Sequence, residues 1–476
     1  MTKRQRMESA DTSKPASPSE STPALESKDS DRPKHTPGIC AFWIKKKARY
    51  CKWEVRHDGD PFCSNHTESK QRVPCPLDPA HSVFKYRLRQ HLKICNKMKQ
   101  DNVQKNYKFY SENVNVDVDP TTSTEIFTSL KQVDSETMKS VITKLDKAVK
   151  ELEFEVPLQS GTELGLPAEI SAEISQEEKK AGVDENTKLP MAVRKSRTFK
   201  KIKNEVQQKA ILEHTFKHAY ESGIPDHICF VEMGAAKGGL SVATRNMLKQ
   251  SDKEYTDISH VLIDRGSFKV RDDREMTGNK DESWERVKID LRHLKLYDID
   301  KVSNAENVIV YSKHLCGAAT CYALRSCVGD QGDSKNDGVK SKQLPQVISI
   351  ALCCHQVCNW DSYPNRALLS NRFNISRYEF DIIRHMSSWA TCGFEKSVET
   401  EHASISDEQK QLDDTGPEWF FNVQEKEMIG KQCKMLLNYG RVLYLRDHGY
   451  NASLIRYATD DITIENVLLL AYLHKA

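Results

Sequence analysis

The chain has no apolar run of about 18 residues, the length that a membrane-spanning helix needs, and no N-terminal signal peptide. We therefore expect a protein that neither crosses a membrane nor enters the secretory route. Its 14 cysteines then favour reduced thiols and metal ligands over disulfides, because disulfides persist only in oxidising compartments. These absences predict an intracellular protein of the nucleus, the cytoplasm or both.

A strong excess of one charge is also missing, since the net charge is only +3 over 476 residues. Positive charge is nevertheless concentrated in residues 40–108, where Lys and Arg exceed Asp and Glu by ten, sixteen against six. Such a segment suits nucleic acid, because cations contact phosphates and aromatic rings stack on unpaired bases. A solvated basic face without a partner is the alternative. The interleaved aromatic residues are Phe42, Trp43, Tyr50, Trp53, Phe84 and Tyr86.

Within this basic segment, Cys75, His81, His91 and Cys95 have the number and type of ligands that a closed zinc site takes. His91 and Cys95 lie four residues apart and can therefore face the same side of a short helix. A metal would replace the apolar core that so short a segment cannot build. We expect a CHHC zinc finger at residues 70–100.

A second ligand set, Cys40, Cys51, Cys63 and His66, ends in a tight Cys-x-x-His pair. Its wider gaps make it less specific than the CHHC set, and unrelated thiols and surface histidines are the alternative for both. We expect a CCCH zinc finger at residues 37–69, preceded by a disordered tail, 1–36, that is rich in Ser, Pro and charge.

Residues 130–155 carry apolar side chains at helical spacing, which predicts either a short coiled coil or an amphipathic helix packed on its own chain. Residues 156–203, first acidic and then basic, are predicted to form a linker. From residue 204 to 476, helices and buried strands alternate. This pattern predicts an α/β domain with a Rossmann-like, doubly wound sheet of seven strands.

Ligands of such sheets bind beyond the carboxyl ends of the strands, where the strand order reverses. Glu232, Gly234 and Gly238 belong to a glycine turn between a strand and a helix, although a plain tight turn is the alternative because the spacing departs from G-x-G-x-x-G. Asp264 and Asp290 end the next two strands, where an aspartate is otherwise often a helix cap. Together these residues predict a nucleoside-binding row.

No Walker loop is present, which leaves a dinucleotide or S-adenosylmethionine as the cofactor. The final pair of strands and the acidic Glu232 before the glycine turn are typical of class I methyltransferases. We therefore expect S-adenosylmethionine.

Two further strands end in the motifs KHLCG, starting at Lys313, and CCHxxC, starting at Cys353. With the two fingers and the glycine turn, and in this order, they make the chain similar to the eukaryotic Trm13-type tRNA 2'-O-methyltransferases from about residue 38 onward. The resemblance implies methyl transfer to the ribose 2'-hydroxyl of nucleotide 4 in the acceptor stem of certain tRNAs. The family's KHLCG motif continues to an acidic residue after its threonine, where this chain has Cys321.

A ribose hydroxyl must lose its proton to a base as it attacks the methyl group. Lys313 is the preferred candidate and His314 its rival, while contacts to the phosphate or backbone of the RNA are the alternative role for both. We expect the second motif to wall the pocket; a third zinc site and a nucleophilic Cys354 are less favoured. Adjacent cysteines at a strand end point to opposite faces, which makes joint ligation awkward. The motif residues are Cys353, Cys354, His355 and Cys358.

Two functions of other classes remain. One is a noncatalytic zinc-finger RNA-binding factor, of the splicing type, whose methyltransferase domain has degenerated; the retained polar row argues against it. The other is an NAD-dependent oxidoreductase, which would leave the basic fingers without a purpose.

Overall fold

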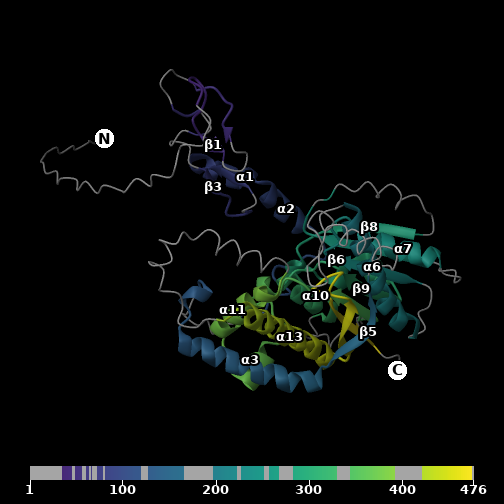
Figure 1. The fold of residues 1–476 in the computed structure, drawn as a ribbon. Coiled ribbons are helices and arrows are strands. Elements are labelled where there is room, and N and C mark those ends of the chain that lie inside the picture. The colour runs from purple at the N-terminus through teal and green to yellow at the C-terminus, as the bar shows by residue number, and fades with distance from the viewer. Residues whose placement is uncertain are drawn as a thin grey trace, which may run out of the picture. The chain divides into compact units, whose positions relative to one another are not determined.

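The computed structural model describes residues 35–44, 49–55, 61–63, 66, 72–78, 81–118, 127–165, 197–221, 227–250, 257–266, 268, 282–329, 344–391 and 421–473. All but the last two residues of the expected tail, and most of the expected linker, lie outside them. The chain divides into two compact units, Met1–Asn102 and Val103–Ala476, and each is described by itself (Figure 1).

The first unit contains two small antiparallel ladders and two short helices. Strand β1 (Trp43–Ile44) pairs with β2 (Arg49–Tyr50), and β3 (Arg72–Pro74) pairs with β4 (Ser82–Phe84). Helix α1 (Leu88–Ile94) buries none of its residues. Helix α2 (Asn96–Gln104) follows it directly and runs past the division between the units. Elements this small cannot enclose an apolar core of their own.

The second unit is built on an eight-stranded sheet in the order β5-β11-β12-β10-β9-β6-β7-β8. Five neighbouring strands, from β8 to β10, are parallel, and β12 runs antiparallel to both of its neighbours. The expectation of an α/β domain is confirmed. The strands are β5 (Leu158–Leu164), β6 (Ile228–Met233), β7 (Ile258–Asp264), β8 (Glu282–Lys288), β9 (Asn307–Ser312), β10 (Val347–Ala351), β11 (Asn451–Ala458) and β12 (Val467–Tyr472).

Helices cover both faces of this sheet. Alternate residues of β6 are buried on opposite faces of the sheet. Ile228 and Phe230 belong to one buried cluster, and Cys229, Val231 and Met233 belong to the other. Strands buried on both faces are typical of parallel sheets. On the first face lie α6 (Arg197–Glu221) and α7 (Gly239–Lys249); on the other lie α3 (Ser135–Glu155), α10 (Ala318–Val328), α11 (Arg377–Met386) and α13 (Val423–Asp447), and α9 (Asp300–Asn304) precedes β9.

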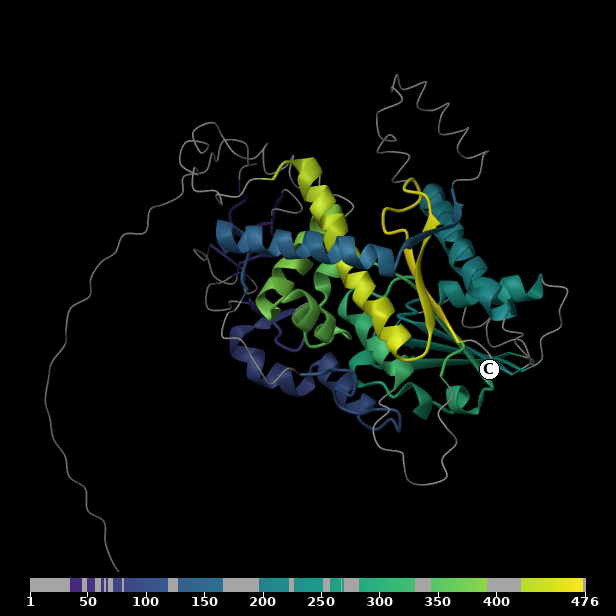
Figure 2. The ribbon, with the colours of Figure 1, turned by 90° about the horizontal axis from the view of Figure 1, so that it is seen from below.

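Helix α3 packs on its own chain. This is one of the two alternatives that the sequence predicts for residues 130–155, the other being a short coiled coil. The Asp134 side chain caps its first turn by accepting a hydrogen bond from Thr137 N at 2.8 Å. The helix lies across α13 (Figure 2), and its Lys144 pairs with Glu379 of α11 at 2.7 Å. The apolar stripe therefore faces the second unit's core, and its buried residues are Met138, Val141, Leu145, Ala148, Val149 and Leu152.

The expected linker and strand count need correction. Residues 158–164 are not linker but strand β5, an eighth strand, which pairs in parallel with β11 and places Leu158 opposite Leu454. Its sequence shows little hydrophobic alternation, because β5 is an edge strand of the sheet and main-chain hydrogen bonds to β11 hold it rather than a buried face. At the other end, residues 197–203 form the first turns of α6. Both ends of the supposed linker are therefore regular structure.

No helix in the described part of the chain is both long and apolar enough to cross a membrane.

Candidate active site and metal centres

The four expected CHHC ligands converge in the first unit. The Cys75 and Cys95 sulfurs are 3.9 Å apart, and His91 Nε2 is 3.3 Å from Cys75 Sγ and 2.9 Å from His81 Nε2. A tetrahedral zinc site with bonds of about 2.0 to 2.3 Å has edges of roughly 3.3 to 3.8 Å, so the donor set fits this metal. Asp78 Oδ2 lies 3.4 Å from His81 Nδ1, the other ring nitrogen, where a carboxylate orients a metal-binding imidazole.

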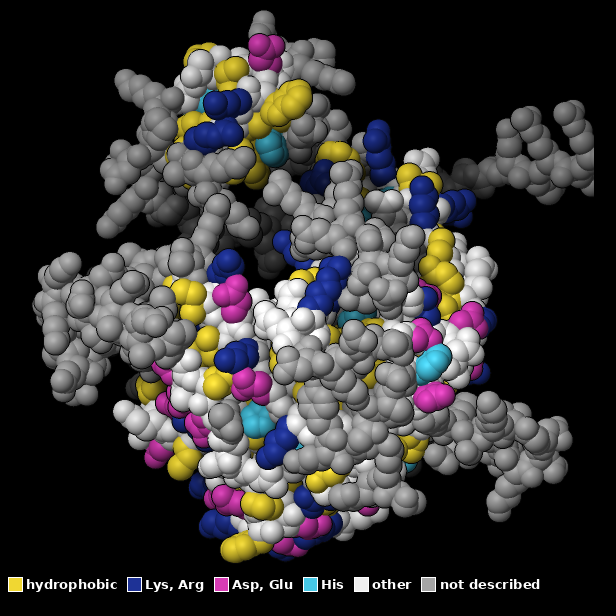
Figure 3. All heavy atoms as spheres, turned by 90° about the vertical axis from the view of Figure 1, so that its right-hand side faces the viewer, with side chains coloured by type: hydrophobic (Ala, Val, Ile, Leu, Met, Phe, Trp, Pro, Cys, Tyr) yellow, Lys and Arg dark blue, Asp and Glu magenta, His cyan; other side chains and the backbone are white. Residues whose placement is uncertain are grey.

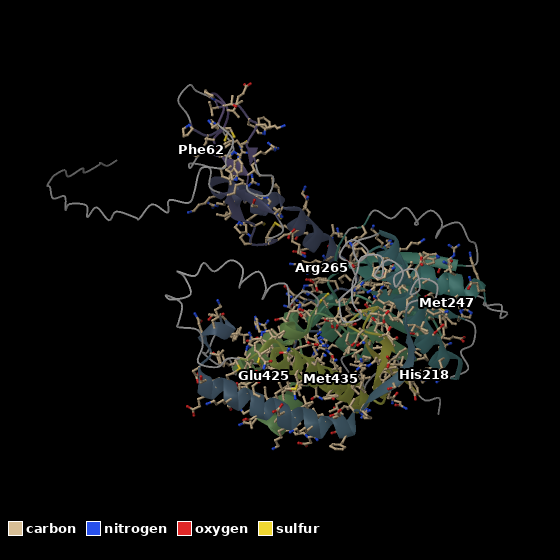
Figure 4. The ribbon with its side chains drawn as sticks, in the orientation of Figure 1. Phe62, His218, Met247, Arg265, Glu425 and Met435 are labelled. Carbon is tan, nitrogen blue, oxygen red and sulfur yellow. The ribbon has the colours of Figure 1, made fainter. Side chains whose placement is uncertain are left out.

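The CCCH ligands converge in the same way. His66 Nδ1 lies 3.3 Å from both Cys40 Sγ and Cys63 Sγ, and Cys51 completes the group. Burial lowers the pKa of His66, which favours the neutral ring that binds metals. Three of the four donors are buried thiols, beside which Phe62 packs (Figure 4). Buried ligands of this kind are typical of a closed structural zinc site.

Aromatic rings surround the CCCH ligand set. Phe42 stacks on the His66 ring with 4.0 Å between centroids, yet it remains 44% exposed, and Trp53 is 67% exposed. Lys and Arg side chains lie beside hydrophobic ones on the finger surface seen in Figure 3. Exposed rings among cations are what stacking on bases and contact with phosphates require.

In the second unit, the strand order reverses between β6 and β9, and the glycine turn follows β6 at this point. Gly234 and Gly238 have φ of +69° and +79°, which favour glycine. A Cβ on Gly234 would lie 3.1 Å from Leu315 Cδ1 and 3.3 Å from His314 O. The turn therefore touches the chain leaving β9, and a side chain at residue 234 would be crowded as well as strained.

Asp264 ends β7 and holds this turn. One carboxylate oxygen accepts from Ala236 N at 2.9 Å and the other from Gly266 N at 2.7 Å. A carboxylate has room for about four hydrogen bonds, so Asp264 keeps acceptor capacity for a ribose diol.

Glu232 is buried beneath the start of α7. Its carboxylate accepts hydrogen bonds from Ser241 N at 2.8 Å and Ser241 Oγ at 2.5 Å. Burial outweighs these bonds and raises the pKa of Glu232 to about 7. The side chain thus anchors the helix that the glycine turn begins.

Asp290 follows β8 and caps a short 3₁₀ helix (Leu291–His293) by accepting from Arg292 N at 3.0 Å. Its own N–H donates to Gln104 Oε1 at 3.1 Å. The capping alternative for a strand-end aspartate therefore applies here.

Lys313 follows β9 and is 9% exposed. Its Nζ donates to Asn204 Oδ1 and, at 3.3 Å, to Asn204 O, both in α6. Burial lowers the pKa of Lys313 to about 8, although the Glu232 carboxylate opposes the shift. A lysine in this state is neutral in an appreciable fraction near pH 8, as a general base must be. Sequence patterns offered no sign of Asn204, which is 109 residues away.

His314, unlike Lys313, has a side chain that is exposed to solvent. Partial burial and the neighbouring Lys313 charge lower the pKa of His314. Such a ring is neutral at pH 7 and remains able to contact a substrate.

The residues of CCHxxC separate into two groups. Cys353 and Cys354 share one place with Cys316 of KHLCG, and the Cys316 and Cys353 sulfurs are 3.7 Å apart. The expectation that adjacent cysteines diverge is wrong here, because Cys354 has a left-handed φ of +49° that breaks the alternation of an extended strand. His355 instead bonds Asn438 Oδ1 at 2.7 Å, away from this group.

Cys358, the last residue of the motif, lies with Cys321 around the fully buried Arg441. Arg441 Nη2 is 2.9 Å from Cys358 Sγ and 3.6 Å from Cys321 Sγ, and it donates to Gly317 O at 3.3 Å. Although burial opposes it, a hydrogen bond from Cys358 and the Arg441 charge lower the pKa of Cys321. Arg441 therefore ties KHLCG to CCHxxC through a buried charge, and Cys321 has a structural place.

A cavity of about 530 Å³ lies between α3 and α13, with Met435 and Tyr439 in its wall (Figure 4). None of the expected site residues lines it. The chemistry-bearing residues instead gather at the strand ends.

These features define a protein that joins two metal-binding modules to an α/β domain with a polar row at its switch point. Comparison with known families agrees: residues 206–472 match the family described as Methyltransferase TRM13. Because this match covers more than half of the 476 residues, the chain belongs to the TRM13 methyltransferase family. Residues 72–96 match a U11-48K-like CHHC zinc finger, and residues 38–67 match the CCCH zinc finger in TRM13 protein.

Relatives of similar length support the assignment. The tRNA:m(4)X modification enzyme TRM13 homolog of Homo sapiens is 28% identical, over 92% of this chain and 96% of the human protein. The tRNA:m(4)X modification enzyme TRM13 of Saccharomyces cerevisiae is 27% identical, over 91% of this chain and 95% of the yeast protein. The similarity to these relatives therefore extends over more than nine tenths of this chain and of each relative.

Proposed function

We propose that this chain methylates the ribose 2'-hydroxyl of nucleotide 4 in the acceptor stem of certain tRNAs, with S-adenosylmethionine as the methyl donor. The observation that carries the proposal is the meeting, at the β6/β9 switch point, of a glycine turn, the Asp264 carboxylate and a buried lysine. The relatives' description as tRNA modification enzymes supports tRNA as the substrate.

The residues at this point fit a nucleoside cofactor. Gly234 and Gly238 let a ligand approach the main chain, and Asp264 has acceptor capacity left for a ribose diol. The final antiparallel strand of the sheet is a further feature that we expect of a Rossmann-like class I methyltransferase. S-adenosylmethionine, when bound here, supplies an electrophilic methyl group.

Lys313 accepts the proton of the attacking hydroxyl in this proposal. Its lowered pKa, near 8, makes the neutral amine available, and its two bonds to Asn204 fix where the amine lies. His314, exposed beside it, positions the RNA.

The two fingers hold the RNA and each takes one zinc ion. Their converged donor sets favour zinc, and the excess of positive charge around them favours a polyanion. We place this activity inside the cell, in the nucleus, the cytoplasm or both.

The test is to methylate tRNA transcripts with the full chain and locate the product's methyl group by nuclease digestion and mass spectrometry. The proposal expects a 2'-O-methylated nucleotide at position 4 and almost no product from Lys313→Met. Cofactor-independent RNA binding without any methyl transfer would instead favour the noncatalytic RNA-binding factor, the alternative that the U11-48K-like finger keeps open.

A further inference from the structure

Three thiols gather at the strand ends of the second unit, outside both zinc fingers. Cys316 lies in the loop after β9, and Cys353 and Cys354 lie just after β10. Their sulfurs are all within 4.8 Å of one another. We call these three residues the strand-end cysteines. The two finger matches cover residues 38–67 and 72–96, so neither includes these cysteines.

The fold holds this group in place. Strands β9 and β10 are parallel neighbours, so their carboxyl ends meet at one edge. Gly317 N donates to Cys353 O at 3.4 Å, and a Cβ on Gly317 would lie only 2.5 Å from Val357 Cγ2. The two loops are therefore packed against each other. The left-handed φ of Cys354 then turns its thiol to the side of the other two.

The spacing of the strand-end cysteines is that of metal ligands. The Cys316 and Cys353 sulfurs are 3.7 Å apart, and the Cys75 and Cys95 sulfurs of the CHHC finger are 3.9 Å apart. Two thiolates bound to one zinc ion at about 2.3 Å are separated by roughly 3.8 Å. Thiolates at such distances repel one another, and a bound cation removes that cost.

The remaining residues of CCHxxC do not complete the group. His355 Nε2 is engaged by Asn438, and Cys358 lies against the buried Arg441. Three protein ligands therefore leave a fourth coordination position free. Since Cys316 is exposed, an ion and a water molecule can reach it. Three protein ligands and one open position are typical of zinc sites that exchange their fourth ligand.

We propose that Cys316, Cys353 and Cys354 bind a third zinc ion, with water in the fourth position. The ligands bind as thiolates, so each thiol that is protonated beforehand releases its proton to solvent when the ion enters. The convergence of these ligands stands whether or not the chain transfers a methyl group.

The first test counts zinc in the full chain, purified with reductant and zinc, by elemental analysis. We expect about three ions per chain, two from the fingers and one from the strand ends. Cys316→Ser and Cys354→Ser should each lose about one ion. The matched control is Cys433→Ala, which removes a buried thiol of α13 that lies in none of the ligand groups and should keep all the zinc.

The second test needs no variant. Peptide mass spectrometry follows alkylation of Cys316 in the wild-type chain by iodoacetamide, before and after chelation. We expect zinc to protect this exposed thiol and chelation to expose it. Two zinc ions per chain together with equal alkylation in both states would overturn the proposal, as would a third ion that survives in Cys316→Ser.

Discussion

The finger unit and the α/β unit are held together by different means. In the CCCH finger, the buried cluster consists of Cys40, Cys51 and Cys63, and in the CHHC finger helix α1 buries none of its residues. In the α/β unit, buried aliphatic and aromatic side chains cover both faces of an eight-stranded sheet. A metal must replace the apolar core in the first unit and need not do so in the second. The difference predicts that the RNA binding proposed for the first unit and the catalysis proposed for the second can be lost separately.

Chelation of zinc should produce the largest difference in stability between the two units, because a structural zinc ion contributes about 10 to 16 kcal/mol of folding free energy. Hydrogen exchange in the full chain should become fast across residues 72–96 and stay slow in α13. Acidification should have the same effect, since protonated thiols release zinc. Slow exchange around the CHHC ligands after complete chelation would contradict this comparison.

Lys313→Met should lower turnover by about 10² to 10⁴, because it removes the base while keeping the length and apolar stem of the side chain. Cofactor and tRNA affinities should change little in direct binding measurements. His314→Ala is the comparison variant, and it should cost less if His314 only positions RNA. Near-normal turnover by Lys313→Met would remove the lysine from the chemistry.

Deleting the finger unit should weaken tRNA binding and flatten its salt dependence by about one unit of slope for each phosphate that the protein no longer neutralises. The affinity for S-adenosylmethionine should be unchanged. The deletion must end at Asn102, because Asn115 Nδ2 donates to Leu291 O at 2.6 Å and Leu294 O at 2.8 Å inside the second unit.

A longer deletion, of residues 1–118, supplies the control. It removes Asn115 and with it the side-chain hydrogen bonds to the Leu291 and Leu294 carbonyls, a loss of about 1 to 3 kcal/mol. The melting temperature should therefore fall for this deletion and not for the shorter one. If the shorter deletion methylates dilute tRNA as well as the whole chain does, the fingers serve another partner.

Turnover should rise about tenfold per pH unit up to pH 8 and level off above it, because a base works only after losing its proton. The residual activity of Lys313→Met should lack this rise of turnover with pH, and the activity of His314→Ala should keep it. A step that persists unchanged in Lys313→Met would assign the titration to another group, of which Glu232, with a pKa of about 7, is the nearest candidate.

The smallest expected effect belongs to Asn204→Leu, a variant of similar size. It removes the Oδ1 acceptor that stabilises the charged amine, so the pKa of Lys313 should fall further, by about one unit or less. The midpoint of the turnover profile should move to lower pH by that amount. An unmoved midpoint would show that this hydrogen bond does not tune Lys313.

Sequence reasoning succeeded where side-chain pattern carries the information. Buried apolar runs between helices revealed the strands β6 to β12, and ligand type and spacing revealed both finger sets. The sequence predicts the glycine turn and Asp264 at the same edge of the sheet, because the carboxyl ends of parallel strands meet at one edge. The structure brings the two together there.

Sequence reasoning failed where main-chain pairing, or contacts between residues distant in the sequence, determine the structure. Strand β5 carries little hydrophobic pattern, since pairing with β11 holds it. Asn204 meets Lys313 only after folding. The left-handed conformation of Cys354 is rare for a residue other than glycine, so the convergence of the strand-end cysteines could not be anticipated.

The most direct test of the division between the units is a calorimetric titration of S-adenosylmethionine into full-length Gly234→Asp, paired with a tRNA-binding measurement. Gly449→Asp is the matched control, because Gly449 also has a positive φ, +85°, but a Cβ at this residue would meet nothing within 4 Å. The account predicts that Gly234→Asp loses cofactor binding and keeps tRNA affinity, while Gly449→Asp keeps both. Equal loss of tRNA and cofactor affinity in Gly234→Asp would contradict it.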